Sequence, residues 1–145
     1  MKTSKLYGVE LDNVTGRIAK QLYQQANIAV QGFEDTSLPD TFFDLAIGNV
    51  PFGSYGIADK KYDKYKFLIH DYFFAKTLDK VRPGGIIAFI TSKGTMDKQN
   101  PEVRKYIAQR AEFLGAVRIP NNAFLDNAGT EVTTDILFLQ KRDRM

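Results

Sequence analysis

The chain has 145 residues, a formal net charge of +3 and 43% hydrophobic residues, which is an ordinary composition for a globular protein large enough to bury a core. It contains no cysteine and one histidine, which argues against disulfides and against thiolate or histidine metal sites. No apolar run approaches the ~20 residues that cross a bilayer, and the first residues lack the apolar region of a signal peptide. We therefore expect a cytoplasmic protein with no membrane segment and no metal. The small positive charge permits nucleic-acid binding without requiring it.

The first third of the chain alternates short apolar runs with one amphipathic segment. In that segment four apolar residues recur at every fourth position, so we expect this face to pack on a sheet: Val14, Ile18, Leu22 and Ala26. Asp12 or Asn13 can cap the helix. The expected elements are strand 6–12, helix 14–25, strand 27–31 and strand 42–47. This rhythm predicts a parallel sheet.

The rest of the chain predicts a helix, a fully apolar strand and a final pair of strands. Arg82-Pro83-Gly84-Gly85 should end the helix and turn the chain. The expected elements are helix 67–81, strand 86–91, helix 102–113, strand 115–120 and strand 134–140. We expect the last two strands to form an antiparallel unit at the edge of the sheet.

Asn49-Val50-Pro51-Phe52 stands where the third strand ends. Ligands of open α/β sheets bind at the carboxyl ends of the strands. Asn49 offers both a hydrogen-bond acceptor and a donor, Pro51 holds Val50 extended, and Phe52 offers a face for stacking. These groups suit a flat, hydrogen-bonding substrate such as a nucleobase.

The same four residues resemble the catalytic Asn-Pro-Pro-(Tyr/Phe) motif of amino-group methyltransferases, which include the N6-adenine DNA methyltransferases and use S-adenosylmethionine. The resemblance implies that the Asn49 side chain and the Val50 carbonyl accept hydrogen bonds from the target amino group. Pro51 would support them, and Phe52 would stack on the flipped-out base. Val50 stands where the family usually has proline, and a valine carbonyl can still accept. Residues 82–90 and 133–139 also resemble segments of that family.

Four further residues are candidates for binding the cofactor. Glu10 ends a strand, where a carboxylate can accept both ribose hydroxyls; the alternative is a surface carboxylate beside a helix N-terminus. The resemblance also implies an acid near the cofactor adenine after the next strand. Phe33 could stack on that adenine, and Glu34 or Asp35 could accept from its amino group. The sequence does not choose among them.

Three other features of the sequence have both a functional and a structural interpretation. The loop 54–66 interleaves four lysines with three tyrosines, which suits DNA contact or an ordinary solvated loop. Ser92 and Lys93 should face the same crevice as Asn49, where they could contact phosphate or form a simple turn. His70 is more consistent with a packed side chain than with a general base.

The resemblance implies parts that are not seen in this sequence. The family has a first strand and a Gly-rich loop before the position of Glu10, and it carries a target-recognition domain. The missing strand would lie between strands 6–10 and 42–47. We therefore expect those two strands to pair directly, or the chain to oligomerise.

Residues 1–145 are thus interpreted as a single partial catalytic domain with a Rossmann-like α/β methyltransferase sheet. The sheet should be mostly parallel, with an antiparallel C-terminal edge and without the first strand. The expected function is that of a fragment of an S-adenosylmethionine-dependent DNA adenine-N6 methyltransferase, weakly active or inactive alone. Its expected partners are DNA, the missing domains and a possible second copy. The alternatives are methylation of RNA or of protein glutamine, or a non-catalytic domain that binds DNA or protein.

Overall fold

The computed structural model describes the chain except for residues 1–2, 52, 54, 121–132 and 145. It divides into two compact units, Met1–Leu38 and Pro39–Met145. Each unit is described by itself. The interpretation of residues 1–145 as one catalytic domain stays a prediction.

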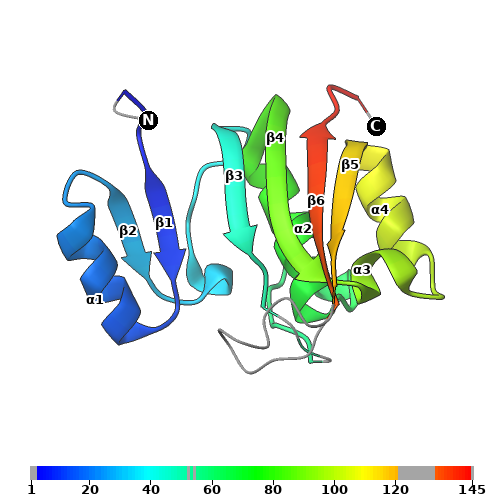
Figure 1. Cartoon of the computed structure of the whole chain (residues 1–145), viewed down its shortest axis with the longest axis horizontal. Coiled ribbons are helices and arrows are strands. Elements are labelled where there is room, and N and C mark those ends of the chain that lie inside the picture. Colours follow the sequence, from blue (N-terminus) through cyan, green and yellow to red (C-terminus); the bar gives the residue numbers. More distant parts are fainter. Residues whose placement is uncertain (1–2, 52, 54, 121–132, 145) are drawn as a thin grey trace. The chain divides into compact units, whose positions relative to one another are not determined.

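The first unit is a strand–helix–strand motif followed by a short 3-10 turn (Figure 1). Its elements are β1 (Tyr7–Glu10), α1 (Asn13–Leu22), β2 (Asn27–Val30) and η1 (Phe33–Asp35). The two strands are parallel, and Glu10 lies beside Val30. The Asp12 carboxylate accepts the N–H of Thr15 at 2.7 Å, which confirms the expected cap and lowers the pKa of Asp12.

The prediction that the apolar face of α1 packs on a sheet is wrong. Val14, Ile18 and Leu22 keep 64%, 55% and 71% of their surface exposed. The buried residue of the helix is Gly16, and a Cβ at that position would lie 2.6 Å from the Val30 side chain. Because glycine has no side chain, α1 approaches β2 closely through this face, and the apolar stripe is left outside.

The second unit is a four-stranded sheet in the order β3-β4-β6-β5 (Figure 1). β3 is parallel to β4, and β6 is antiparallel to both β4 and β5, as expected for the C-terminal edge. The elements are β3 (Phe43–Asn49), η2 (Asp63–Tyr65), α2 (Ile69–Lys80), β4 (Val81–Ser92), α3 (Gly94–Asp97), α4 (Glu102–Arg110), β5 (Ala111–Ile119) and β6 (Thr134–Lys141).

β4 begins five residues earlier than expected, because residues 82–85 belong to the strand rather than to a turn. Gly84 has a φ of +81°, and a Cβ on Gly85 would collide with the Val81 side chain. The register between β3 and β4 shifts at Phe43/Leu45, opposite this stretch. The Pro-Gly-Gly sequence therefore forms an irregularity inside a long strand.

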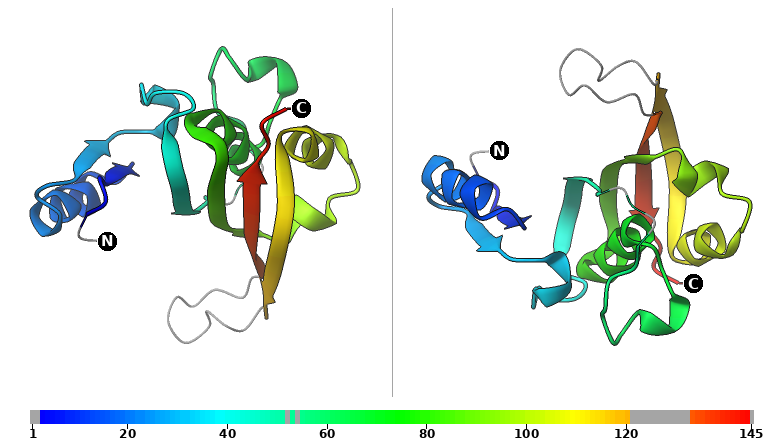
Figure 2. Two further views of the ribbon diagram at one scale, coloured as in Figure 1. Left: turned by 90° about the horizontal axis from the view of Figure 1, so that it is seen from above. Right: turned by 90° about the horizontal axis from the view of Figure 1, so that it is seen from below.

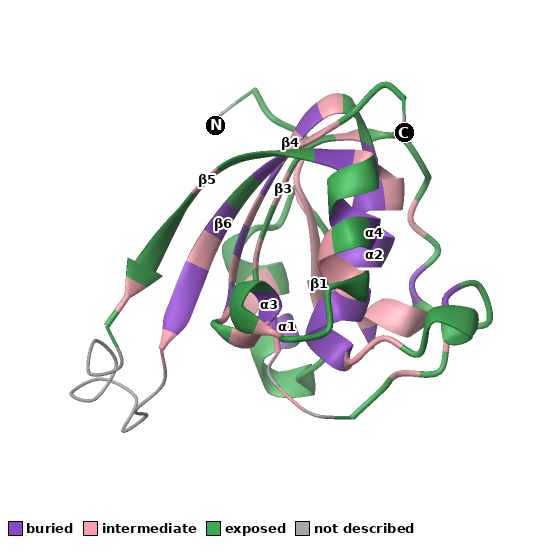
Figure 3. Cartoon of the chain, turned by 90° about the vertical axis from the view of Figure 1, so that its right-hand side faces the viewer, coloured by how far each residue is buried: buried purple, intermediate pink, exposed green. Residues whose placement is uncertain are grey.

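Helices α2 and α4 cover one face of the four-stranded sheet (Figures 2 and 3). Alternate residues of β4 and β6 point into the core between the sheet and these helices. The core consists of Val50, Phe74, Leu78, Val81, Ile87, Phe89, Ile107, Ala111, Leu137 and Leu139. On the other face, large apolar side chains remain exposed, among them Leu45, Ile47, Val117 and Phe138.

The hydrogen-bonded ladders form two separate sheets, with β1 beside β2 and β3 beside β4. The expected direct pairing of strands 6–10 and 42–47, which belong to different units, and oligomerisation both stay predictions. Within the described residues, no helix is long and apolar enough to span a membrane.

Candidate functional site

Asn49 is the last residue of β3, with an exposed side chain on a firmly held backbone. It lies beside Ile90 of β4, and the next N–H, that of Val50, donates to the Ile90 carbonyl at 2.9 Å. The Val50 side chain is 2% exposed and belongs to the core. Within the described residues, no donor reaches the Val50 carbonyl. The motif thus combines a solvent-facing amide with a fixed backbone and an available acceptor.

The motif continues with Pro51 and Phe52. Pro51 is half-buried and follows directly on the anchored Val50. Phe52 lies outside the described residues.

The carboxyl end of β4 lies at the same edge of the sheet as Asn49, because the two strands are parallel and Asn49 is in register with Ile90. Thr91 is fully buried, and its hydroxyl lies 2.9 Å from that of Thr95. Ser92 is half-buried and Lys93 is exposed. Ser92 and Lys93 therefore lie at the edge where the sequence predicted them.

The beginning of α2 contributes a buried polar pair, His70 and Asp71. His70 Nε2 lies 3.4 Å from Asp71 Oδ1, and Lys98 Nζ donates to Asp71 Oδ2 at 2.9 Å. Neither His70 Nδ1 nor Asp71 Oδ1 has a hydrogen-bond partner among the described residues. His70 is packed inside the unit, as expected. No sequence pattern indicates the Asp71–Lys98 pair, whose members are 27 residues apart.

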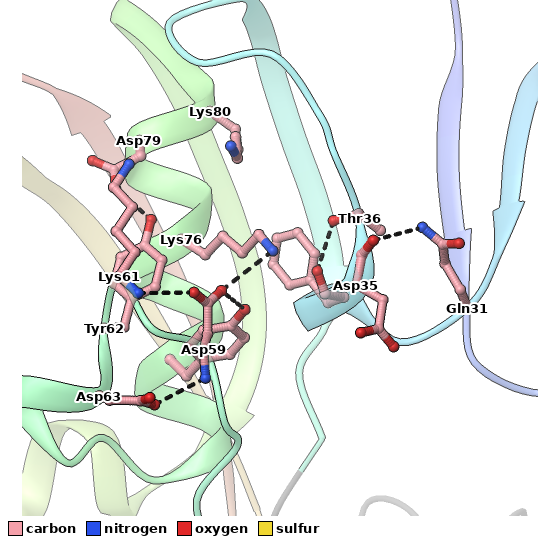
Figure 4. Close-up of polar contacts among 12 residues, drawn as sticks. Gln31, Asp35, Thr36, Asp59, Lys61, Tyr62, Asp63, Lys76, Asp79 and Lys80 are labelled. Atoms are coloured by element: carbon pink, nitrogen blue, oxygen red, sulfur yellow. Dashed lines mark hydrogen bonds and ion pairs between the residues drawn. The ribbon is translucent and has the colours of Figure 1, made fainter.

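The four cofactor candidates stand at or shortly after the carboxyl ends of the two strands of the first unit. Glu10 ends β1, and its Oε1 accepts the Asp12 N–H at 2.9 Å. Phe33, Glu34 and Asp35 form η1, shortly after β2 ends. The loop is held by its own hydrogen bonds: the Thr36 hydroxyl donates to the Phe33 carbonyl and the Gln31 amide to the Asp35 carbonyl (Figure 4).

The 54–66 loop is tied to α2 through the cluster in Figure 4. Lys61 pairs with Asp79 at 3.1 Å, and the Tyr62 hydroxyl donates to the same carboxylate. Asp59 accepts from Tyr72 at 2.7 Å and lies 3.6 Å from the buried ammonium of Lys76. Burial opposes the charge on Asp59, but these contacts outweigh it and lower the pKa of the carboxyl.

These contacts place the middle of the loop at the amino end of the sheet. Asp79 is in the last turn of α2, just before β4 begins, and its carbonyl accepts the Thr41 N–H ahead of β3. Asn49 lies at the opposite end of β3. A hollow of about 190 Å³ at this end is lined by Lys61, Tyr62, Lys64, Tyr65, Asp79, Tyr106 and Arg110. The position of Lys61 does not favour the predicted DNA contact beside Asn49.

Burial dominates the titration of two tyrosines at this hollow. It raises the pKa of Tyr62, and the adjacent Asp79 carboxylate adds to the effect. It raises the pKa of Tyr106 to about 12. Both hydroxyls therefore stay neutral well above the ordinary tyrosine range.

The sequence profile of the family described as "Eco57I restriction-modification methylase" matches residues 3–124. The chain belongs to the Eco57I restriction-modification methylase family. Its Rossmann-like α/β fold agrees with this membership. Within the described residues, no group of three or more histidine or acidic side chains could hold a metal ion.

This Eco57I-family chain is similar to parts of three longer proteins. It is 33% identical over 138 residues to the "Defense against restriction protein B" of Escherichia phage P1, covering 91% of this chain and 6% of that protein. A structure from Listeria monocytogenes, assigned as a class I S-adenosylmethionine-dependent methyltransferase, matches with a TM-score of 0.76 and 22% identity, over 96% of this chain and 45% of that one.

A structure from Vibrio vulnificus YJ016, assigned as a modification subunit of a type I restriction enzyme, also matches with a TM-score of 0.76. Its identity is 16%, over 97% of this chain and 33% of that one. The Eco57I-family chain thus spans less than half the length of each of these three proteins.

Proposed function

We propose that this chain is part of an S-adenosylmethionine-dependent DNA adenine-N6 methyltransferase, in which Asn49 and the Val50 carbonyl hold the target amino group. The observation that carries the proposal is the arrangement at the end of β3. An exposed amide and an available carbonyl follow one another on a backbone that the β4 ladder and the core fix in place. Membership of a methylase family supports the same reading.

The proposed chemistry needs little acid or base strength from the chain. The two oxygens accept the N–H bonds of the adenine N6 group, so its lone pair is directed at the methyl donor. They would also stabilise the positive charge that develops on nitrogen as the N–C bond forms and the methyl–sulfur bond of S-adenosylmethionine breaks, which leaves S-adenosylhomocysteine. The proton that leaves N6 afterwards passes to water. His70 is packed among its neighbours and is not needed as a base.

The cofactor candidates in the first unit fit an adenosyl group in their chemistry. Glu10 uses one carboxylate oxygen to accept the Asp12 N–H, and the other accepts no hydrogen bond from the described residues. That oxygen is available to a ribose hydroxyl. Phe33, Glu34 and Asp35 would face the adenine. S-adenosylmethionine supplies the electrophilic methyl group; the cytoplasm is the expected place of action.

A labelled-methyl assay tests this function. The chain is incubated with methyl-tritiated S-adenosylmethionine and, in separate reactions, with adenine-containing single-stranded DNA, RNA and a glutamine-containing peptide. We expect slow incorporation of label into N6-methyladenine of the DNA, because the chain alone is expected to be at most weakly active. The Asn49→Ala variant should lower the rate roughly 10²–10³-fold, because it removes one group that stabilises the developing charge.

Lys60→Gln is the matched control, since Lys60 is exposed in the 54–66 loop. Its rate should equal that of the unaltered chain. Label in RNA or peptide would reassign the acceptor. Equal rates for Asn49→Ala and the unaltered chain would contradict the proposed role of the motif.

A further inference from the structure

The segment Lys93–Lys98, called here the α3 segment, is held at the Asn49 edge by ion pairs to other elements. Lys98 at its end binds the buried Asp71 of α2 at 2.9 Å. Asp97 binds Arg118 of β5 at 2.9 Å, and Arg118 also forms a two-point contact with the buried Asp135 of β6, at 2.8 and 3.0 Å. The hydrogen bond from Arg118 lowers the pKa of Asp97, so the Asp97–Arg118 ion pair stays charged at neutral pH.

Backbone contacts fix the same segment. The Lys93 N–H donates to the Thr133 carbonyl at 3.2 Å. Arg104 of α4 donates to the carbonyls of Met96 and Lys98. The Thr95 hydroxyl is buried against Thr91. This short segment is therefore anchored to α2, α4, β4 and β5 and to the residue before β6, which makes it a rigid platform rather than a loose loop.

Lys93 is the cation of this platform that remains available. Its side chain is exposed and forms no ion pair with the described residues, although it lies within electrostatic reach of Asp97. Asp97 is already paired with Arg118. By contrast, Lys61 of the 54–66 loop is paired with Asp79 at the opposite end of the sheet.

We propose that the α3 segment is the nucleic-acid contact surface of this unit, with Lys93 binding a backbone phosphate next to the base held at Asn49. Asp71 is a positioning residue, which acts on Lys93 through Lys98. The inference rests on the proposed function, because it takes the ligand of the site to be DNA. A phosphate is recognised by a lysine ammonium through charge, with no sequence information.

The test measures how binding of a fluorescein-labelled, adenine-containing 20-mer of single-stranded DNA depends on salt, by fluorescence anisotropy. Lys93→Gln should weaken binding and lower the slope of log K against log salt by about 0.7, the value for one phosphate contact on a single strand. Lys60→Gln removes an exposed lysine from the 54–66 loop and should leave both affinity and slope unchanged.

Asp71→Asn tests the positioning role. It leaves Lys98 without its carboxylate partner, so the platform should loosen and the slope should fall as in Lys93→Gln. The double variant should show no further fall, because both changes remove the same phosphate contact. A merely structural Asp71 would change the unfolding midpoint and leave the slope as it is. Circular dichroism confirms that each variant is folded.

Several results would overturn the inference. Loss of slope in Lys60→Gln but not in Lys93→Gln would move the contact to the 54–66 loop. Additive losses in the double variant would refute the positioning role. If the unaltered chain binds no DNA while calorimetry still detects S-adenosylmethionine, the nucleic-acid contact is refuted and the cofactor part of the proposed function survives. If neither binds, the proposed function fails with it.

Discussion

Asn49 combines an exposed side chain with a backbone that the next residue fixes in place. The amide faces solvent, while Val50 is buried and hydrogen-bonded to β4. The position usually occupied by proline in the resembling motif is thus restrained here by packing rather than by a ring. We infer that this packing supplies part of the backbone rigidity that a proline at this position would give.

Residue-scale predictions from the sequence were accurate where the signal is local. The end of a strand predicted the exposed Asn49, and the acid before an amphipathic run predicted the Asp12 cap. The pairs Lys61–Asp79 and Lys98–Asp71 could not be predicted, since their members are far apart in the sequence and no periodic pattern relates them.

Tyr106 gives a pH dependence with a defined sign. Its side chain is buried against Phe67 and Tyr65, with the Arg110 guanidinium 3.5 Å from the ring centre. Its pKa is raised from 10.0 to about 12, so the fold favours the neutral hydroxyl. This contribution to stability is complete below pH 10 and is lost as the pH rises from 10 towards 12.

Tyr106→Phe keeps the ring and removes the titration. Urea unfolding at pH 8 should give nearly the same stability for both proteins. At pH 11 the unaltered chain should lose about 1 kcal/mol more than the variant, relative to their values at pH 8. An equal loss in both proteins would show that Tyr106 does not remain neutral in the fold.

At the scale of elements, periodicity predicted the strands and helices better than it predicted their packing. The parallel β3–β4 pair and the antiparallel C-terminal edge follow from the order of apolar runs and from the resemblance. The packing face of α1 does not. A period of 3.6 residues identifies the apolar face of a helix. It does not show that Gly16, on another face, lets α1 approach β2 more closely.

Gly16 provides the test of that packing. Gly16→Ala should improve helix propensity by about 1 kcal/mol, yet the new Cβ would lie 2.6 Å from the Val30 side chain. A β-branched valine cannot easily move away, so we expect a net destabilisation of roughly 1 kcal/mol.

A double-mutant cycle measures whether residues 16 and 30 repel each other. In a Val30→Ala background the two closest methyl groups are gone and only the Cβ of residue 30 remains, at 3.2 Å, so Gly16→Ala should become much less destabilising. Hydrogen exchange of the α1 amides measures both effects within the first unit. A stabilising Gly16→Ala in the unaltered background would show that Gly16 does not pack on β2.

At the scale of the whole molecule, large apolar side chains are exposed in both units. Ile47 on β3 is 70% exposed, and the α1 stripe is similarly open. Patches of this kind mark surfaces that bind other protein segments. The chain spans 6% of its phage relative, 45% of the Listeria structure and 33% of the Vibrio structure.

The most direct test of the central claim is the nuclear magnetic resonance signal of the Asn49 side-chain amide in the ¹⁵N-labelled chain, assigned with Asn49→Ser. The chain is titrated with adenine-containing single-stranded DNA in the presence of S-adenosylhomocysteine, with oligothymidylate as the control. We expect adenine DNA to shift the signals of the Asn49 amide and of the Lys93 backbone more than the thymidine control does. Shifts confined to residues 59–66, with Asn49 unmoved, would contradict this expectation.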